Sequence, residues 1–321
     1  EVRVSTFKDG EIDIEFSEVR GKDVFVVNSI CRNATRSVND ALVETLLMIS
    51  ALKRASARHI TAIIPYYGYA RQDRKLSGRV PISAADIARL LETVGVDRVC
   101  SVDLHCGQIQ GFFPPHVPMD NLGAGPIGAA WFADSEPRLV RPVVVSPDAG
   151  GVARAKNFRE MLVAQGFPNT GVAMIIKQRS GASAIERMDL VGNVTGCDCI
   201  IVDDMADTAG TLCKAAKVLK EAGALKVHAF CTHGVFSDGA AANLACSVID
   251  RMVVTNTVPL PVAMLNESRV HVLDLSPILA ETVKRLHNKC SISAIFANQG
   301  GQGKRRSLVP LPTSEPSKAK L

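Results

Sequence analysis

Short runs of β-branched and other apolar residues alternate along the chain with stretches whose apolar residues recur every three or four positions. The short runs predict strands at Val24–Asn28, Ile60–Pro65, Arg98–Asp103, Pro142–Ser146, Gly171–Ile176, Cys199–Asp203, Val227–Thr232, Met252–Thr255 and Val270–Asp274. Several of these runs are continuously apolar, as expected of strands that are covered on both faces in a parallel sheet.

Between the strands, apolar residues that share one helical face predict helices. The faces are Val38, Leu42, Leu46 and Ile49; Ile87, Leu90, Leu91 and Val94; and Leu212, Ala215, Ala216 and Leu219. Ser37 with Asp40, and Ser83 with Asp86, resemble capping boxes at the starts of the first two helices. Gly95 can end the second helix in a left-handed conformation. Alternating strands and helices predict an α/β chain of the doubly wound kind.

The same pattern runs through two halves and changes over near the loop-rich segment Gly111–Pro142. We predict an N-terminal domain over residues 1–140 and a C-terminal domain over 141–298, each with one open sheet. Residues 299–321 lack apolar periodicity and predict a disordered basic tail. The chain starts at Glu1 with a sequence typical of the middle of a domain, so we expect its N-terminus to be truncated.

Composition and charge narrow the class of protein. With 321 residues, 47% hydrophobic and 21% charged, the chain is long and apolar enough to bury sizeable cores. The net charge is +5, but the segment from Asn298 onward carries +4 of it, which leaves the body nearly neutral. A nearly neutral body with 5% aromatic residues argues against a nucleic-acid binder. No apolar run approaches the roughly 18 residues of a membrane span, so no membrane partner is expected.

The cysteines and the last three residues bear on location. Nine cysteines occur without C-x-x-C pairs or zinc-type spacing, which is typical of a reduced intracellular compartment. Ala319-Lys320-Leu321 is a conservative variant of the Ser-Lys-Leu peroxisomal address. The alternative is a basic tripeptide that ends a disordered tail by chance. We therefore expect a cytoplasmic protein, or one delivered to peroxisomes or glycosomes.

The strongest candidate site runs from Ile200 to Thr211. A buried strand ends in Asp203 and Asp204, and a turn of small and hydroxylated residues then opens a helix. Ligands of open α/β sheets collect at the carboxyl ends of strands, and a helix N-terminus offers free N–H groups to a phosphate. The segment predicts a site for ribose hydroxyls or hydrated magnesium beside a phosphate. The alternative is an acidic turn with a threonine cap.

Other candidate residues lie at the ends of further strands. Arg71 and Gln72 follow one strand on a basic loop, and Asp103 and His105 are predicted to project from one face at the end of another. Asp148 ends a third strand. Taken alone, Arg71 and Gln72 are more typical of a solvated basic loop, and His105 of a structural histidine.

Two further cations, Lys177 and Arg179, follow an apolar strand and precede small polar residues, the pattern of a catalytic lid. A surface loop with two bases is the alternative. The segment Gly123–Gly128 also fits G-x-G-x-x-G, but no strand is predicted before it and Pro126 lies inside it. We therefore expect no dinucleotide site there.

The motifs together resemble the ribose-phosphate pyrophosphokinase (phosphoribosyl pyrophosphate synthetase) family over nearly everything from Phe7 to Ala297. They are Tyr69-Ala70-Arg71-Gln72-Asp73, Pro81-Ile82-Ser83-Ala84, Asp103-Leu104-His105, Gln108-Ile109-Gln110-Gly111-Phe112-Phe113, Ser146-Pro147-Asp148-Ala149-Gly150-Gly151, Asp203-Asp204-Met205-Ala206-Asp207-Thr208-Ala209-Gly210-Thr211 and Thr232-His233-Gly234. The resemblance implies two phosphoribosyltransferase-like domains, each an open mainly parallel sheet flanked by helices. It also implies transfer of the pyrophosphoryl group of Mg-ATP to the C1 hydroxyl of ribose 5-phosphate, which gives 5-phosphoribosyl 1-diphosphate and AMP.

The resemblance implies roles for individual residues. The catalytic residues are Lys177 and Arg179; ATP is bound by Phe7, Asp9, Glu11, Arg71, Gln72 and His105; ribose 5-phosphate by Arg179, Asp203, Asp204, Asp207, Thr208, Ala209, Gly210 and Thr211; and Mg²⁺ by Asp103, His105 and Asp148. Phe7, Asp9 and Glu11 would reach a neighbouring subunit's nucleotide, which implies a homo-oligomer, by resemblance a hexamer of dimers. Without the resemblance, their Asp-Gly dipeptide simply predicts a hairpin turn.

The chain departs from the family pattern at two places. Residues 30–38 are expanded, and residues 114–119 are longer than usual and lack an acid after Phe113. Both neighbourhoods border the family's regulatory site for phosphate and ADP. Two other functions stay open, a regulatory subunit that kept the fold and lost turnover, and a phosphoribosyltransferase. The presence of Lys177, Asp203 and Asp204 favours an active synthetase.

Overall fold

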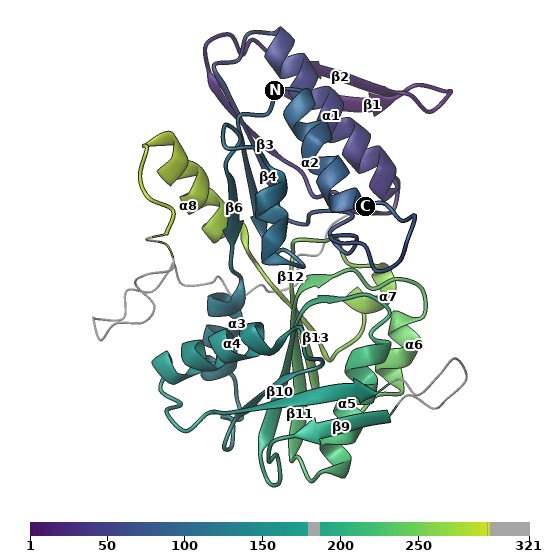
Figure 1. Ribbon diagram of the computed structural model, residues 1–321, viewed down its shortest axis with the longest axis vertical. Coiled ribbons are helices and arrows are strands. Elements are labelled where there is room, and N and C mark those ends of the chain that lie inside the picture. The colour runs from purple at the N-terminus through teal and green to yellow at the C-terminus, as the bar shows by residue number, and fades with distance from the viewer. Residues whose placement is uncertain (179–186, 294, 296–321) are drawn as a thin grey trace, which may run out of the picture.

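The computed structural model describes residues 1–178, 187–293 and 295, and the statements below concern these residues. Two parallel sheets lie one above the other with helices around them (Figure 1). The first sheet has the order β3-β4-β5-β6, with β3 at Asp23–Val27, β4 at His59–Ile64, β5 at Arg98–Val102 and β6 at Met119–Leu122. A separate antiparallel hairpin, β1 (Val2–Thr6) and β2 (Ile12–Phe16), projects at the N-terminal end (Figure 1).

The second sheet has the order β13-β12-β11-β10-β7-β8-β9 and is parallel except for the β8–β9 pair. Its strands are β7 (Val143–Ser146), β8 (Gly171–Gln178), β9 (Arg187–Val191), β10 (Asp198–Ala206), β11 (Lys226–Gly234), β12 (Arg251–Thr255) and β13 (Val270–Leu273). The helices are α1 (Val38–Arg54), α2 (Ser83–Thr93), α3 (Gly125–Asp134), α4 (Val152–Ala164), α5 (Gly210–Glu221), α6 (Ala240–Ala245), α7 (Val262–Leu265) and α8 (Ser276–His287), with a 3₁₀ turn η1 at Gly107–Phe112. The expected α/β architecture of open, mainly parallel sheets flanked by helices is confirmed.

The nine strands predicted from apolar runs are all present, with bounds that shift by a few residues at most. The pattern missed β6, whose Met-Asp-Asn-Leu sequence is half polar, and it missed β9 and the β1–β2 strands. Helix α3 also lies inside the segment that we interpreted as loop-rich. Short edge strands carry polar residues because only part of their surface is covered, so they give a weak apolar signal.

The predicted helix ends have mixed outcomes. The capping box at α1 is confirmed, since the Ser37 hydroxyl accepts from the Asp40 N–H at 3.2 Å and the Asp40 carboxylate from the Ser37 N–H at 2.7 Å. The predicted box at Ser83 is wrong, because the Ser83 hydroxyl donates to the Gln72 side chain instead. Gly95 ends α2 with a φ of +95°, as predicted.

The glycine motif at residues 123–128 also needs a correction, because β6 directly precedes it and α3 begins inside it at Gly125. The absence of a strand was therefore a wrong reason for excluding a dinucleotide site. Gly128 instead serves packing, because a side chain there would lie 2.5 Å from the Phe230 ring. This close approach lets α3 lie against the second sheet.

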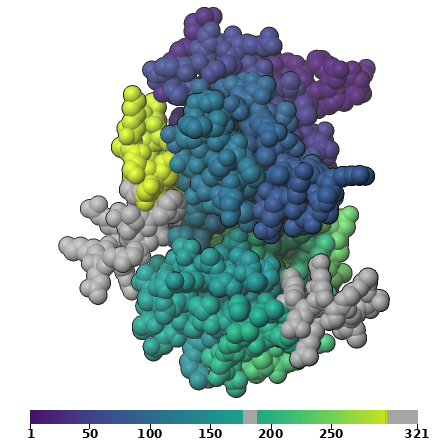
Figure 2. Space-filling view, in the orientation of Figure 1, coloured from purple at the N-terminus to yellow at the C-terminus, as the bar shows by residue number. Residues whose placement is uncertain are grey.

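Helices are exchanged between the two halves. Phe132 of α3 packs against Phe158 and Phe230 of the second half, although α3 precedes the predicted boundary near residue 140. Conversely, α8, drawn in yellow, lies against the first half (Figure 2). This exchange ties the halves together, and the boundary itself stays a prediction. Among the helices that the structure describes, none is both long and apolar enough to cross a bilayer.

Candidate functional site

The acidic pair lies near the carboxyl end of β10. Ile200, Ile201 and Val202 are almost fully buried and hold the strand in the middle of the second sheet. The side chain of Asp203 is 22% exposed and that of Asp204 only 4%. Two neighbouring carboxylates with so little access to water need cations nearby to stay ionised.

Two basic side chains contact this pair, each from a different element. The Arg154 Nη1 of α4 lies 3.2 Å from Asp203 Oδ1 and 3.5 Å from Asp204 Oδ1. The His105 Nδ1, from the loop after β5, lies 2.8 Å from Asp204 Oδ2. The result is a compact network of two carboxylates, one guanidinium and one imidazole at the edge of both sheets.

The network changes the pKa values of its members. Burial, and then the charge of Asp204, raise the pKa of Asp203. Burial also opposes ionisation of Asp204, but hydrogen bonding to His105 and the charge of Arg154 lower its pKa overall. The hydrogen bond to Asp204 raises the pKa of His105. Asp204 therefore ionises more readily than a free aspartate, and Asp203 gains a proton more readily.

The predicted phosphate loop follows directly. Ala209 has a left-handed φ of +59°, which turns the chain so that α5 starts at Gly210 with no side-chain cap on its N–H groups. The Asn243 amide of α6 donates to the Thr208 carbonyl at 2.8 Å and holds the loop from behind. Uncapped N–H groups and the positive end of the helix dipole suit a phosphate.

An ion pair joins this loop to the first half of the chain. The Arg71 Nη1 donates to Asp207 Oδ2, across 136 residues of sequence. Burial disfavours the charged forms of both side chains. Their contact nevertheless helps to lower the pKa of Asp207 and to raise the pKa of Arg71. The structure thus brings together Arg71, predicted for ATP, and Asp207, predicted for ribose 5-phosphate.

Asp103 and His105 do not act on a common partner. β5 ends at Val102 and Asp103 has a φ of +39°, so the strand alternation that predicted a shared face does not reach these residues. Asp103 Oδ2 accepts from the Thr232 hydroxyl at 2.6 Å and from the Ala124 N–H at 2.9 Å. Asp103 therefore joins the first half to Thr232 of the second half, whereas His105 contacts the acidic pair.

The predicted metal ligands are not gathered in one place. Asp148 Oδ1 accepts from the Gly151 N–H at 3.0 Å in the turn before α4. Within residues 1–178, 187–293 and 295, no group of three or more His, Cys, Asp or Glu side chains is arranged to hold a metal ion. A metal bound here would need oxygen ligands from elsewhere, such as substrate phosphates and water.

The other described candidates, the hairpin residues and Lys177, belong to elements other than β10. Phe7, Asp9 and Glu11 form the tip of the β1–β2 hairpin, where the Glu11 N–H donates to Asp9 Oδ1 at 3.1 Å and the Phe7 side chain is 56% exposed. This confirms the predicted hairpin turn. Lys177 belongs to the carboxyl end of β8, and Arg179 lies outside the described residues.

A cavity of about 1020 Å³ adjoins the Arg71–Asp207 pair. Residues 31–35, Val38 and the loop around Tyr69 and Gln72 line it from the first half. Ser237 and residues 258–262 line it from the second half. The expanded segment that departs from the family pattern is therefore one wall of a cavity between the halves.

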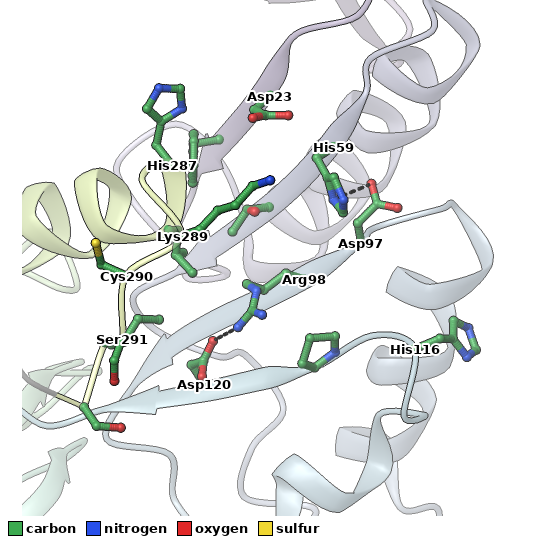
Figure 3. A pocket seen from close by; sticks show the side chains of 16 residues that line it. Asp23, His59, Asp97, Arg98, His116, Asp120, His287, Lys289, Cys290 and Ser291 are labelled. Atoms are coloured by element: carbon green, nitrogen blue, oxygen red, sulfur yellow. Dashed lines mark hydrogen bonds and ion pairs between the residues drawn. The ribbon is translucent and has the colours of Figure 1, made fainter.

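A second pocket, of about 700 Å³, lies on the first sheet and is closed by the end of α8 and residues 289–293 (Figure 3). Arg98 pairs with Asp120, and His59 lies 3.8 Å from Asp97, within one layer of strands. Lys289 extends into this pocket from the opposite side (Figure 3). His116, from the lengthened segment 114–119, also lines it.

The sequence analysis missed two residues of the site. Arg154 contacts the acidic pair, and Asn243 contacts the phosphate loop. Asn243 has no distinguishing sequence context. Arg154 could have been noticed from the sequence, because it lies in the first turn of a helix, where the helix dipole disfavours a cation. Such a residue needs a negatively charged partner elsewhere in the fold.

Comparisons with known proteins agree with this architecture. Residues 1–95 match the family model for the N-terminal domain of ribose phosphate pyrophosphokinase, and residues 172–297 match the phosphoribosyl synthetase-associated domain. The chain is 50% identical to ribose-phosphate pyrophosphokinases of Shewanella oneidensis (92% of this chain, 90% of the relative) and Haemophilus influenzae (91% and 90%). The crystal structure of phosphoribosylpyrophosphate synthetase from Mycobacterium smegmatis superposes with a TM-score of 0.79 and 41% identity, covering 90% of this chain and 91% of that one.

Proposed function

Because the chain belongs to the ribose-phosphate pyrophosphokinase family, we propose that its acidic pair and phosphate loop form the ribose 5-phosphate site of that enzyme. The enzyme transfers the pyrophosphoryl group of Mg-ATP to the C1 hydroxyl of ribose 5-phosphate, and the products are 5-phosphoribosyl 1-diphosphate and AMP. Relatives at 50% identity over nine-tenths of the chain are named as this enzyme, which sets aside a regulatory subunit and a phosphoribosyltransferase.

One observation carries the assignment of the site. Two adjacent carboxylates with little access to water lie shortly before a left-handed turn and a helix N-terminus whose N-cap residue, Ala209, provides no side-chain cap. Asp203 and Asp204 accept hydrogen bonds from ribose hydroxyls, and residues 207–211 surround the 5-phosphate.

ATP is bound next to the ribose site by three residues of the first half, Arg71, Gln72 and His105. Pyrophosphoryl transfer requires mainly positioning and charge neutralisation, since negative charge collects on the transferred oxygens as AMP leaves. Lys177 and Arg179 supply positive charge to that group. We assign no general base.

Mg²⁺ is proposed to arrive with ATP, because it prefers oxygen ligands, retains water and uses few protein carboxylates. When bound, it neutralises polyphosphate charge. Asp148 would hold it directly and His105 through water. Asp103 stays a proposed ligand through its Oδ1 atom, because both of the hydrogen bonds that it accepts end on Oδ2.

We also propose a homo-oligomer, by resemblance a hexamer of dimers, and the hairpin supports this proposal. Its tip projects from the body and exposes Phe7, as expected of a segment that completes a neighbour's nucleotide site (Figure 1). Size-exclusion chromatography with light scattering tests this assembly, and Phe7→Ala should raise the KM for ATP. A monomer with full activity would contradict it.

Two finer assignments are also proposals. Phosphate and ADP are candidate regulators at the two departures from the family pattern, residues 30–38 and 114–119. Location is either cytoplasmic or, through Ala319-Lys320-Leu321, peroxisomal or glycosomal; the tripeptide lies outside the described residues. A fluorescent reporter fused to residues 310–321 distinguishes the two, because a diffuse signal removes the organelle.

The function is tested by supplying ribose 5-phosphate and Mg-ATP and measuring AMP. Lys177→Ala should lose most turnover while the circular dichroism spectrum and oligomer size stay unchanged. Lys156→Ala, an exposed lysine of α4, is the matched control and should keep full activity. Wild-type protein that makes no AMP would overturn the function, and an active Lys177→Ala variant would overturn only the lysine's role.

A further inference from the structure

Arg154 occupies an unfavourable place in its helix. Gly151 is the N-cap of α4, so Arg154 is the third helical residue and belongs to the first turn. The positive end of the helix dipole disfavours a cation there. An arginine at this position is therefore stabilised by something outside its own helix.

The compensation comes from β10, about 50 residues further along the chain. The Arg154 guanidinium contacts Asp203 Oδ1 at 3.2 Å and Asp204 Oδ1 at 3.5 Å. Its side chain is 27% exposed, so the charge is partly removed from water. Among the described residues, Arg154 is the cation that contacts both carboxylates.

A shared cation matters because neighbouring residues of a strand point to opposite faces. Asp203 and Asp204 would then present their carboxylates in different directions. In the structure Asp203 Oδ1 also accepts from the Asp204 N–H at 2.9 Å, so its side chain folds back toward its neighbour. Arg154 lies where both carboxylates can converge on one cation.

The packing of α4 keeps Arg154 in this place. Ala155, Phe158 and Leu162 of the same helix are buried against the second sheet. The helix therefore cannot rotate its first turn away from β10 without exposing that apolar face. This rigidity is what a residue that positions others requires.

We propose that Arg154 is a positioning residue for ribose recognition. It orients the two carboxylates so that they accept from the two vicinal ring hydroxyls of ribose 5-phosphate, and it offsets their mutual repulsion before the sugar binds. This inference rests on the proposed function of the acidic pair. It concerns the sugar and not ATP, so its effects should be confined to one substrate.

The first test compares Arg154→Met with Arg159→Met. Arg159 lies on the same helix, is 33% exposed, and pairs with Glu160 rather than with the acidic pair. Arg154→Met should raise the KM for ribose 5-phosphate about 10-fold or more, with less than about a 2-fold change for ATP. Arg154→Lys, which keeps the charge but loses the fork geometry, should recover part of the loss. Arg159→Met should match wild type in both constants.

The second test uses 2-deoxyribose 5-phosphate, which lacks one of the two hydroxyls. Wild-type protein should prefer ribose 5-phosphate strongly, judged by kcat/KM. Arg154→Met should lower that preference about 10-fold, because disordered carboxylates gain little from the second hydroxyl. A purely structural defect would reduce both substrates equally and leave the preference unchanged.

The outcomes separate the inference from the function beneath it. If wild type forms no AMP, the proposed function fails and the inference fails with it. If wild type is active and both Arg154 variants keep its KM for ribose 5-phosphate and its preference, only the inference is overturned. If circular dichroism shows that Arg154→Met does not fold, Arg154→Lys decides, with a raised KM supporting the inference and an unchanged one refuting it.

Discussion

Charged side chains between the two halves have partners that are distant in the sequence. Charged side chains around the pocket on the first sheet have partners that are much nearer in the sequence. Arg71 and Asp207 are 136 residues apart, and His105 and Asp204 are 99 apart. Around the pocket in Figure 3, Arg98 and Asp120 are separated by only 22 residues and lie on neighbouring strands. The first kind of pair exists only when the two sheets meet, whereas the second kind forms within one sheet.

The two regions also differ in their access to water. Asp204 is 4% exposed, whereas Arg98 and Asp120 are each about one-third exposed. Breaking a nearly buried pair leaves an uncompensated charge in a low dielectric, while an exposed pair is replaced by water at little cost. We therefore expect the buried acidic pair to matter for both function and stability, and the exposed Arg71–Asp207 and Arg98–Asp120 pairs to contribute little to stability.

The largest effect is expected from Asp204→Asn. The substitution removes the charge that meets both His105 and Arg154, and leaves Arg154 with only Asp203. We expect turnover to fall on the order of 100-fold and the free energy of unfolding to fall by about 2–4 kcal/mol. AMP formation and urea unfolding measure the two quantities.

Asp250→Asn is a control for Asp204→Asn, because Asp250 pairs with Lys220 at the far end of the sheet's strands and is 37% exposed. It should leave turnover unchanged. Wild-type turnover in Asp204→Asn would show that the acidic pair takes no part in the reaction, and the contrast between the two regions would disappear.

A buried histidine without a partner extends the comparison. His228 of β11 is 2% exposed, its Nδ1 has no hydrogen-bond partner among the described residues, and burial lowers its pKa from 6.5 to about 4. The unfolded chain therefore binds a proton that the folded chain rejects between these values. Stability should fall by about 2 kcal/mol from pH 7 to pH 5 on this account.

Urea unfolding at the two pH values, for wild type and His228→Leu, measures this contribution. The variant should be less sensitive to acid, with a residual slope from His233, whose pKa burial also lowers. His105, whose pKa is raised, contributes stability of the opposite sign, present below its unfolded pKa and lost as pH rises through the folded one. Equal slopes in both proteins would refute the assignment to His228.

A smaller effect is expected from Arg71→Met. The side chain is 55% exposed, so the Asp207 pair itself contributes little to stability. The KM for ATP should nevertheless rise about 10-fold, because the cation that meets the nucleotide is lost. Steady-state kinetics at saturating ribose 5-phosphate gives this constant. Arg98→Met, whose arginine also pairs with one aspartate, should leave it unchanged.

The smallest effect is expected from Asp120→Asn in the pocket on the first sheet. Its pair with Arg98 is about one-third exposed on both sides and lies far from the acidic pair in sequence. The free energy of unfolding should change by less than about 1 kcal/mol, and basal turnover by less than about 2-fold. A loss as large as that of Asp204→Asn would erase the distinction between the two regions.

Much of the fold was predictable because its signals are local. The runs at Ile60–Pro65 and Cys199–Asp203 became buried central strands, and the Ser37–Asp40 box formed as the spacing indicated. The failures were also local. Ser83 found a better partner in Gln72, and β6 carries too few apolar residues to be distinguished from a loop.

Only the part of the site that is continuous in the sequence was predictable. Asp203, Asp204 and the loop to Thr211 are consecutive, so their chemistry could be interpreted directly from the chain. Arg154 could not be identified in this way, because its partners lie on a strand that it meets only after α4 has packed on the second sheet. Asp103 was placed on a shared face with His105 because alternation was extended past the true end of β5.

The sequence by itself determined the α/β class, the position of the acidic loop at the carboxyl edge of a strand, and the residue types that can meet a sugar and a phosphate. These features depend on periodicity and on neighbours within a few residues. The tertiary structure alone decided the charge partners, namely Arg154 and His105 for the acidic pair and Arg71 for Asp207. It decided them because an ion pair depends on distance in space. For Arg154 this distance is set when α4 packs on the second sheet, and for His105 and Arg71 it is set when the two halves meet.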